Sequence, residues 1–437
     1  MDLVAHLEQT LYRYVSAPPA EELRIAGWRF AVSDMTVVKA GIRNNSLGDV
    51  YASPGVSKSC AGDLLIIWPG ERCSHAVINT AVVRELESKL PGWKQGSFRD
   101  PEGSALLAPQ PLPLVGVEHQ GVKRMVQQDP RDLFELLARF RQELPQRGVE
   151  NIQAGVQAGW GLRHVRTSKG LSVSYAQTSF SAYAQADGLY GRGFAKRRSP
   201  TQAEAGALIE NTAAVTKMLK RDGSLRDGRM SIIFAPELVE AFCAKYLLTN
   251  FSGNNVVHKQ AAYTVEDFVR GGQVLDPRLS LAINPLREME LSSYLCTREG
   301  LPARKEFLVK GGKLITPYLT VKDSIKAGLP PTPLPQGQGI WLEVDGARTL
   351  TALIEGTESG ILVYSVLGLH TQDPVSGSYS LAAPQCLRIE KGKIAGRVKT
   401  VIAGNFLEHL ADPGTEYGLE PGESFPVLKF EAKVAQG

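Results

Sequence analysis

The chain holds residue types that could carry chemistry, but none of them forms a recognised catalytic motif. No histidine is followed by glutamate, which excludes the His-Glu-x-x-His zinc motif and its longer relatives. The G-x-S-x-G, G-x-x-x-x-G-K-[ST] and G-x-G-x-x-G patterns are also absent. The histidines lie far apart, and each is more typical of a surface or core histidine than of a metal ligand: His6, His75, His119, His164, His258, His370 and His409. We therefore predict no catalytic residues and no metal ligands in this chain.

Cysteine is the remaining candidate nucleophile. The five cysteines are odd in number and never form C-x-x-C, which favours reduced thiols over a disulfide frame or a zinc ribbon. A nucleophilic pair could combine Cys243 or Cys296 with His258 or His370, but Cys243 lies in an apolar helical run where burial would make its thiol inert. An autonomous hydrolase, using Cys296 or a cluster of His258, His370 and Asp373, stays open as an alternative. Burial of Cys296 would contradict it.

A polar loop that follows an apolar run is a candidate binding site. The apolar run Ile361–Leu367 leads into a polar segment around Asp373, in which Pro374 and Gly377 indicate a tight turn. Polar loops placed after buried strands often form sites. A well-hydrogen-bonded structural turn explains the segment equally well.

Length and composition bound the class of protein. A chain of 437 residues is too long for one ordinary core, so we expect two domains. No apolar run approaches the roughly 20 residues that span a bilayer, and the N-terminus reads as an amphipathic helix, so we expect a cytoplasmic protein with no membrane contact. The net charge is +4, and the two basic clusters lack interleaved aromatic residues, which disfavours nucleic-acid binding; the clusters are Lys196–Arg198, and Lys217, Lys220, Arg221, Arg226 and Arg229.

The periodicity of apolar residues and the turn signals predict the elements that would position these groups. Helices are expected at Leu3–Val15, Ala76–Leu90, Arg131–Leu144, Thr201–Lys220 and from Pro236 to about Thr249. Strands are expected at Trp28–Val32, Asp49–Ala52, Asp63–Trp68, Asn151–Ala158, Leu171–Ala184 (interrupted near Thr178) and Met230–Phe234. Two hairpins are expected, Glu306–Lys310 with Lys313–Leu319 around Gly311-Gly312, and Cys386–Glu390 with Lys393–Val401 around Lys391-Gly392.

These elements predict an α+β fold. We expect an N-terminal α/β domain followed by a large β-rich C-terminal domain, barrel-like or a curved sheet, with peripheral helices. The predicted boundaries are residues 1–200 and 201–437, with a Pro-rich crossing segment near residues 100–115.

The C-terminal part of the sequence resembles the family of the bacterial peptidase pair TldD and PmbA (TldE). The resemblance rests on Leu367–Tyr379 (LGLHTQDPVSGSY), Leu387–Lys393 (LRIEKGK), Val401–Leu407 (VIAGNFL), Ile232–Glu237 (IIFAPE), Ser252–Lys259 (SGNNVVHK), residues 303–319 (ARKEFLVKGGKLITPYL), Thr167–Gly170 and Ser174–Thr178. No single piece is diagnostic, but together they cover most of residues 150–437 in the family's order. The first 100 residues contain none of these motifs and resemble the family only in general character.

The resemblance implies a division between two kinds of subunit. TldD-type subunits carry His-Glu-x-x-x-His on the helix after the "APE"-like strand, and a cysteine near the C-terminus as a third zinc ligand. Here the matching helix, Ala241–Thr249 (AFCAKYLLT), has no His, Glu or Asp, and no cysteine follows Cys386. The resemblance therefore implies a PmbA/TldE-like, non-catalytic subunit of a TldD-type metallopeptidase complex that acts on unfolded or small peptides. Zinc is expected only in the TldD-like partner.

Position within the family also suggests residues that face a peptide channel: Ser252, Asn254, Asn255, Asp373, Ser376 and Tyr379. The expected partners are a TldD-like subunit in a heterodimer, or a second copy in a homodimer, together with the peptide substrate. Besides the autonomous hydrolase, the alternative is a nucleic-acid-associated regulator, suggested by the family's older label of gyrase modulator and by a pI of about 8.7.

Overall fold

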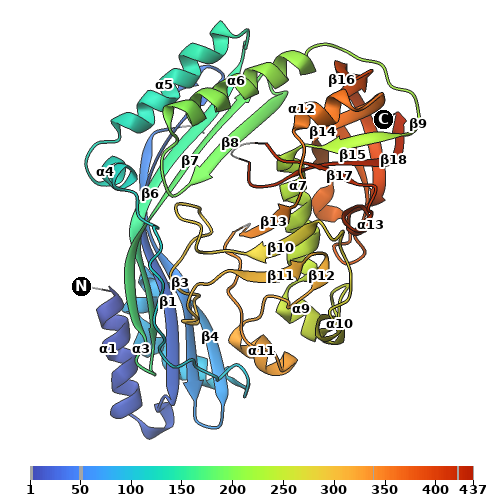
Figure 1. The fold of residues 1–437 in the computed structure, drawn as a ribbon. Coiled ribbons are helices and arrows are strands. Elements are labelled where there is room, and N and C mark those ends of the chain that lie inside the picture. Colours follow the sequence, from blue (N-terminus) through green and yellow to red (C-terminus); the bar gives the residue numbers. More distant parts are fainter. Residues whose placement is uncertain (1–2, 49–52, 338, 421–422, 437) are drawn as a thin grey trace.

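The fold is described here from a computed structural model that covers residues 3–48, 53–337, 339–420 and 423–436. Three β-sheets organise the chain, which follows the order of the sequence from a long twisted sheet through a small sheet to a barrel (Figure 1). None of the described helices is long and apolar enough to cross a membrane.

The N-terminal sheet has the strand order β5-β4-β3-β1-β6-β7-β8, and β2 pairs with β1 at one end. All pairings in it are antiparallel. Its strands are β1 (Gly27–Arg43), β2 (Ser46–Leu47), β3 (Gly55–Trp68), β4 (Arg72–Asn79), β5 (Phe98–Arg99), β6 (Ile152–Thr167), β7 (Ser172–Ala186) and β8 (Tyr190–Lys196).

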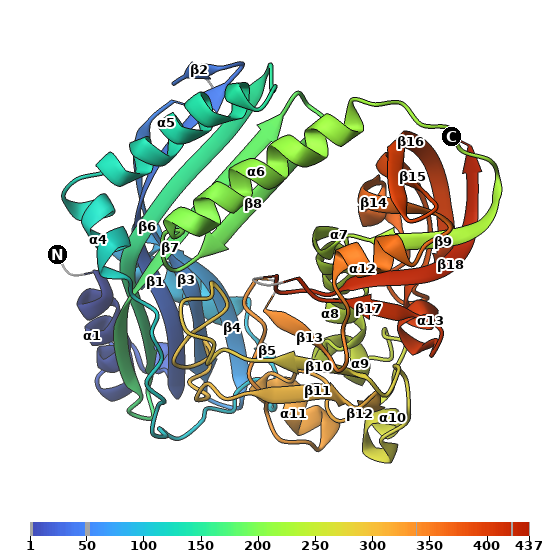
Figure 2. The ribbon, with the colours of Figure 1, turned by 45° about the horizontal axis from the view of Figure 1, so that its top comes forward.

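Six helices pack on one face of this sheet because its strands alternate apolar and polar residues. The inward residues of β1 include Trp28 and Phe30 near one end, and Ala40 and Ile42 near the other. The helices are α1 (Leu3–Ser16), α2 (Thr80–Arg84), α3 (Leu86–Gln95), α4 (Gln120–Gln127), α5 (Arg131–Gln146) and α6 (Gln202–Leu219), and Figure 2 shows α5 and α6 lying along the strands. A short 3₁₀ turn, η1 (Glu21–Leu23), links α1 to β1.

The opposite face of the sheet is covered over only part of its length. Near Arg29 and Ala31 it packs against the segment 284–303, through the Arg29–Glu299 ion pair and through Cys296. Farther along the strands, the same face carries small and polar residues such as Gly155, Gln157 and Ser181, which border an open cavity.

A small sheet with the strand order β12-β11-β10-β13 follows. It comprises β10 (Leu279–Ile283), β11 (Glu306–Lys310), β12 (Lys313–Leu314) and β13 (Ile340–Val344), with α9 (Gly253–Val257), α10 (Val265–Arg270) and α11 (Val321–Ala327) around it. Its apolar residues share one continuous hydrophobic core with the barrel.

The C-terminal sheet closes into a barrel. Its order is β16-β15-β14-β9-β18-β17, and an additional pairing between β16 and β18 completes the ring. The strands are β9 (Gly228–Phe234), β14 (Ser359–Leu367), β15 (Ser378–Glu390), β16 (Lys393–Asn405), β17 (Glu416–Gly418) and β18 (Val427–Gln436). The helical elements around it are α7 (Pro236–Phe242), η2 (Cys243–Leu247), α8 (Leu248–Asn250), α12 (Leu350–Glu355), η3 (Leu369–Thr371) and α13 (Phe406–Ala411).

The predicted fold class is confirmed, including the barrel-like C-terminal region. Both hairpins form, and their turn residues have positive φ, as Gly311 (56°) and Lys391 (49°) show. The predicted domain boundary at residue 200 stays a prediction, since α6 packs on the N-terminal sheet through Leu208 and on the barrel through Leu219.

Three element predictions were wrong in detail. Ala76–Asn79 belongs to β4 because it pairs with β3, and the helices begin only at Thr80. The second strand of the first C-terminal hairpin ends at Leu314, and β7 runs without interruption through Thr178. The strand expected at Asp49–Ala52 lies outside the described residues.

Candidate functional site

The helix that follows β9 is continuous through α7, η2 and α8, and its inward face is aromatic. Pro236 begins α7 at a position where its missing N–H costs nothing. Within this helix η2 is a π-helical turn, a feature that often occurs at functional sites. Phe242 contacts Phe234, Tyr379 and Phe406, with ring centroids 5.0–5.2 Å apart. This face therefore belongs to the barrel core.

Asn250, at the end of the helix, connects three segments. Its side chain is fully buried. The amide Nδ2 donates to the carbonyl oxygen of Pro374 at 2.8 Å, and Oδ1 accepts from the backbone N–H of Ala262 at 2.7 Å. Asn250 thus joins the helix both to the predicted polar loop and to the segment before α10.

Two further contacts bind the same helix to the same loop. The Lys245 ammonium donates to the carbonyl oxygen of His370 at 3.0 Å. The Tyr246 hydroxyl donates to the carbonyl oxygen of Ser378, also at 3.0 Å. The two sets of residues predicted to face a peptide, one after the helix and one in the loop, are therefore attached to a common framework.

Asp373 and Ser376 form a tight, exposed turn. The two carboxylate oxygens of Asp373 accept from the backbone N–H groups of Val375 (3.1 Å) and Ser376 (3.2 Å). These hydrogen bonds hold the pKa of the Asp373 carboxyl below its ordinary value, and the bond from the Val375 N–H has the largest effect. The Ser376 carbonyl accepts from Asn405 Nδ2 at 2.9 Å. The turn is thus preorganised and open to solvent.

Tyr379 lies in the core rather than on an open surface. Its side chain is 3% exposed, and its hydroxyl is 3.0 Å from Nε2 of His409. The His409 ring stacks on Phe430 with a centroid separation of 3.8 Å. Burial lowers the pKa of His409 to about 4 and raises that of Tyr379. A side chain added at Gly404 would stand 2.6 Å from His409 Nε2, so this glycine permits the close approach.

The residues predicted near the helix differ in accessibility. Asn254 is exposed, whereas Ser252 and Asn255 are half-buried. Asn255 Nδ2 donates to the carbonyl oxygen of Thr249 at 3.0 Å, and Ser252 pairs through its backbone with Tyr318. Their role in peptide contact stays a prediction, as does that of Asp373, Ser376 and Tyr379.

The structure argues against the cysteine nucleophiles. Cys296 is 1% exposed, and burial raises the pKa of its thiol to about 11, so little reactive thiolate would exist at neutral pH. Cys243 is completely buried, and burial raises its pKa as well. The burial of Cys296 contradicts the alternative in which the chain is an autonomous hydrolase that uses Cys296.

The inward face of this helix is packed in the hydrophobic core. The side chains of Phe242, Cys243, Tyr246 and Leu247 all lie there. Across the described parts of the chain, no group of three or more His, Cys, Asp or Glu side chains is arranged to hold a metal ion.

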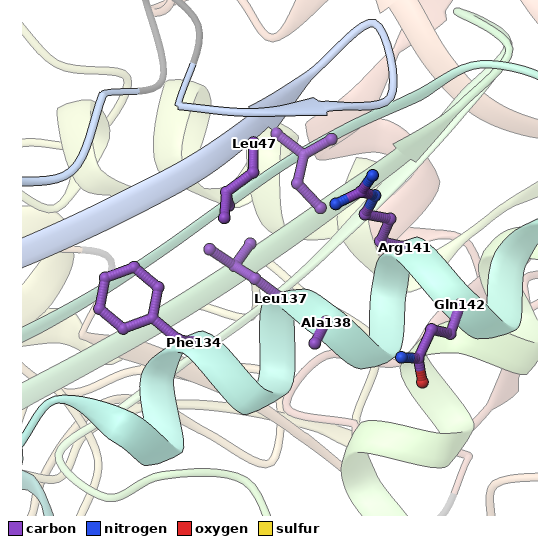
Figure 3. Close-up of a pocket in the computed structure, with 7 residues that line it drawn as sticks. Leu47, Phe134, Leu137, Ala138, Arg141 and Gln142 are labelled. Carbon is purple, nitrogen blue, oxygen red and sulfur yellow. The ribbon is translucent and has the colours of Figure 1, made fainter.

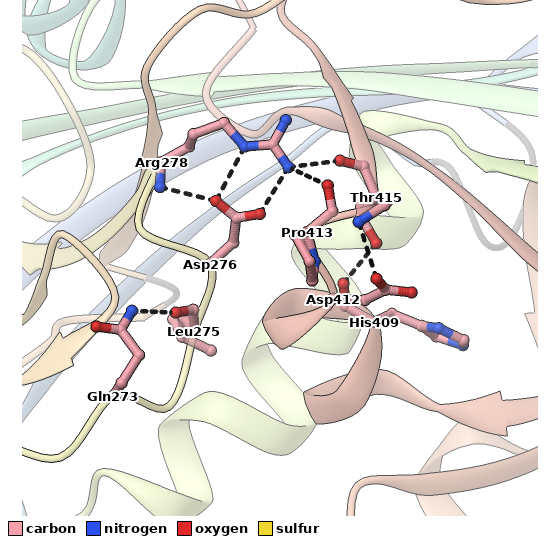
Figure 4. A network of polar contacts seen from close by, with 9 residues as sticks. Gln273, Leu275, Asp276, Arg278, His409, Asp412, Pro413 and Thr415 are labelled. Atoms are coloured by element: carbon pink, nitrogen blue, oxygen red, sulfur yellow. Dashed lines mark hydrogen bonds and ion pairs between the residues drawn. The ribbon is translucent and has the colours of Figure 1, made fainter.

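An ionic network holds the small sheet against α13 of the barrel. Arg278 donates to both carboxylate oxygens of Asp276, at 2.9 and 2.6 Å, and to the carbonyl oxygens of Pro413 and Thr415 (Figure 4). The bond from Arg278 is the main reason why the pKa of Asp276 is low. The framework beneath the polar loop is therefore fixed from this side too. Sequence reasoning missed it, as it missed Asn250 and His409, because each depends on contacts between distant segments.

Two surface cavities lie on the N-terminal sheet. One, of about 290 Å³, is an apolar hollow between the β1–β2 end of the sheet and α5; Leu47 and Phe134 border it, with Arg141 and Gln142 at its rim (Figure 3). The other, of about 310 Å³, lies on the face opposite to the helices and includes Lys39 and Tyr183. Neither is near the polar loop.

Replacing Asn250 by alanine is expected to lower the free energy of unfolding by about 2 kcal/mol, because the Ala262 N–H and the Pro374 carbonyl would lose a buried partner. Urea denaturation measures this cost. Hydrogen exchange should also become faster at Val375 and Ser376. The exposed Asn254→Ala variant is the matched control, with an expected cost below about 0.5 kcal/mol. Equal costs in the two variants would contradict a connecting role for Asn250.

Comparisons with known proteins agree with this architecture. The fold matches TldE from Thermococcus kodakarensis with a TM-score of 0.82 at 18% identity, covering 98% of this chain and 100% of that one. It also matches a putative modulator of a DNA gyrase from Thermotoga maritima (TM-score 0.79, 16% identity, 99% and 100% covered). A putative modulator of DNA gyrase from Bacteroides thetaiotaomicron gives a TM-score of 0.77 at 16% identity, with 100% and 99% covered. No curated protein sequence matches the chain.

The fold is thus that of the TldE-type proteins and the putative gyrase modulators. Residues 227–414, which contain the barrel strands from β9 to β16 and the polar loop, match the family model described as PmbA/TldA metallopeptidase C-terminal domain. This part of the chain therefore belongs to that C-terminal domain family.

Proposed function

We propose that this chain is the non-catalytic, TldE-like subunit of a cytoplasmic TldD-type metallopeptidase complex that cleaves unfolded or small peptides. The observation that carries the proposal is the inward face of the α7–η2–α8 helix. Where the zinc motif of a TldD-type subunit would lie, Phe242 and Tyr246 fill the space with aromatic core, and the Cys243 thiol is buried among them. In this arrangement the chain shapes the peptide site, and a TldD-like partner supplies zinc and cleavage.

The basic cluster Lys196–Arg198 gives no support to the nucleic-acid alternative. Lys196 pairs with Glu290 at 2.8 Å, and Arg198 pairs with Glu204 at 2.6 Å. Arg197 is buried and donates to backbone carbonyls, among them that of Thr178. A phosphate backbone would therefore find few uncommitted cations in this cluster.

Metal content provides the test. The chain purified alone, without added zinc or an affinity tag, is expected to hold less than about a tenth of an equivalent of zinc, because no group of three or more ligand side chains is arranged for a metal ion among the described residues. It should be inactive toward an unfolded peptide, and addition of a TldD-type subunit should produce a stable heterodimer that cleaves the peptide. Close to one equivalent of zinc, or peptidase activity of the chain alone, would overturn the proposal.

A further inference from the structure

The strand β3 is longer than its neighbour β4, and this leaves part of its edge open. Gly55–Ile67 of β3 pair with β1 without a register shift. On the other side, β4 pairs only with Ala61–Trp68, because β4 ends at Asn79 and the chain turns into α2. Within the described ranges, no strand pairs with the outer side of Gly55–Cys60. We call this segment the open edge.

The open edge carries little of the protection that sheet edges usually have. Natural proteins shield such edges with charges, bulges, prolines or covering loops, since unpaired N–H and C=O groups invite another strand. Here Lys58 is the one charged residue of the segment, and the register with β1 contains no bulge. Val56 is 67% exposed, and Ser57, Lys58 and Ser59 are exposed as well.

A cavity lies on the same face of the sheet as the Lys39 side chain, on the inner side of β3. It has a volume of about 310 Å³, and Ser53 and residues of β1, β6 and β7 line it, among them Lys39, Gln157 and Ser181, so β3 separates the cavity from the open edge. Lys39 is directly opposite Gly55 in the β1–β3 pairing, so its side chain lies on the same face as Ser57 and Ser59. Its Cε is 3.8 Å from the position that a Cβ on Gly55 would occupy.

Lys39 provides the charge that selects an occupant. It is exposed and forms no ion pair with any residue that the structure describes. A strand added to the open edge would place alternate side chains on this face, and the one opposite Gly55 would face Lys39 across a residue that has no side chain. An acidic side chain is the complementary one.

We propose that the open edge of β3 binds an extended acidic peptide as an added strand, with an aspartate or glutamate side chain opposite Gly55 that pairs with Lys39. Main-chain hydrogen bonds supply the affinity, and Lys39 supplies the preference for charge. The inference depends on the proposed function only in taking the peptide to be a client of the complex; the binding itself needs no partner subunit.

Fluorescence anisotropy with the full-length chain tests the proposal. The probe is a fluorescein-labelled octapeptide of alternating threonine and glutamate, compared with the same peptide N-methylated at its central amides. N-methylation removes strand donors and is expected to weaken binding at least about tenfold. Hydrogen exchange in the presence of the unmethylated peptide should slow at amides within Gly55–Cys60.

Two charge variants separate the contribution of Lys39 from general electrostatics. Lys39→Glu should weaken binding of the threonine–glutamate peptide about tenfold and favour a threonine–lysine peptide. Lys58→Glu is the matched control, because Lys58 is on the same edge but points to the other face; its effect should stay within about threefold. Equal effects of the two variants would overturn the assignment of Lys39.

Other outcomes also decide the question. No binding by the unmodified chain, or equal binding of the N-methylated peptide, would overturn the proposal. So would a dimer of the free chain in which the Gly55–Cys60 amides are already protected, because a second copy would then occupy the edge. Peptide binding without assembly with a TldD-type subunit would instead support the edge site and contradict the proposed function.

Discussion

Replacing Arg29 by alanine is expected to lower the free energy of unfolding by about 3–5 kcal/mol, because the Glu299 carboxylate would remain buried without its partner. The Arg29 and Glu299 side chains are 9% and 7% exposed, and Nη1 of Arg29 is 2.9 Å from Oε1 of Glu299. The second carboxylate oxygen accepts from the backbone N–H of Val321 at 2.8 Å, which fixes the carboxylate in place. The pair joins β1 of the N-terminal sheet to the segment that precedes β11.

Two variants make this prediction specific. The double variant Arg29→Met/Glu299→Gln removes both charges and keeps a side-chain oxygen that accepts from the Val321 N–H, so it should regain most of the loss, which comes from the unpaired buried charge. Arg99→Ala removes an exposed partner of Glu71 and should cost less than about 1 kcal/mol. Urea denaturation at pH 7 compares the variants. If Arg29→Ala costs no more than Arg99→Ala, the ion pair does not hold the two parts together.

Much of the fold could be predicted from local pattern. The helix α6 was expected at Thr201–Lys220, and the structure gives Gln202–Leu219 with a capping box between Thr201 and Glu204. Hairpins around Gly311-Gly312 and Lys391-Gly392 could be predicted because positive φ at turn residues is a local requirement. Such features depend on a few adjacent residues, so they can be predicted from the local sequence.

Strand partners override local pattern elsewhere. Ala76–Asn79 has apolar residues at a spacing compatible with helix, yet pairing with Ala61–Leu64 makes it a strand. Tyr379 was predicted to face a channel from its position within the family, and that role stays a prediction. In the structure it begins the inward row of β15, in which Tyr379 and Leu381 are buried and Ser378 and Ser380 are exposed. Period-two alternation could have shown this.

The framework of the candidate site was beyond local inference. Asn250 and Pro374 are 124 residues apart in the sequence, and no periodicity relates them. His409 could be described beforehand only as a typical surface or core histidine. Its burial follows from three separate parts of the chain that meet in the barrel: Tyr379 on β15, Phe430 on β18 and Gly404 on β16.

His409 is expected to make the protein sensitive to acid. Its pKa is about 4 in the folded chain, mainly because burial disfavours the charged ring, against about 6.5 in an unfolded chain. Between these values the unfolded chain binds the proton and the folded chain does not, so stability falls as pH falls. The full difference between the two pKa values corresponds to about 3 kcal/mol of stability. This stability is present above pH 6.5 and is lost by about pH 4.

Comparison with a variant isolates this contribution. Glu240 and Glu423 have raised pKa values, chiefly through burial, so their contributions decrease as pH rises, opposite to that of His409. These contributions from other groups are the same in the wild type and in His409→Gln. The loss of stability between pH 7 and pH 4.5 is therefore measured for both proteins, and the difference between the two losses reports on His409 alone. The wild type should lose about 2 kcal/mol more than His409→Gln over this interval, whereas the exposed His370→Gln should behave like the wild type. An NMR titration of His409 near pH 6.5 would contradict the prediction, because a half-buried ring that stacks on Phe430 and is bonded to Tyr379 accepts a proton less readily than one in water.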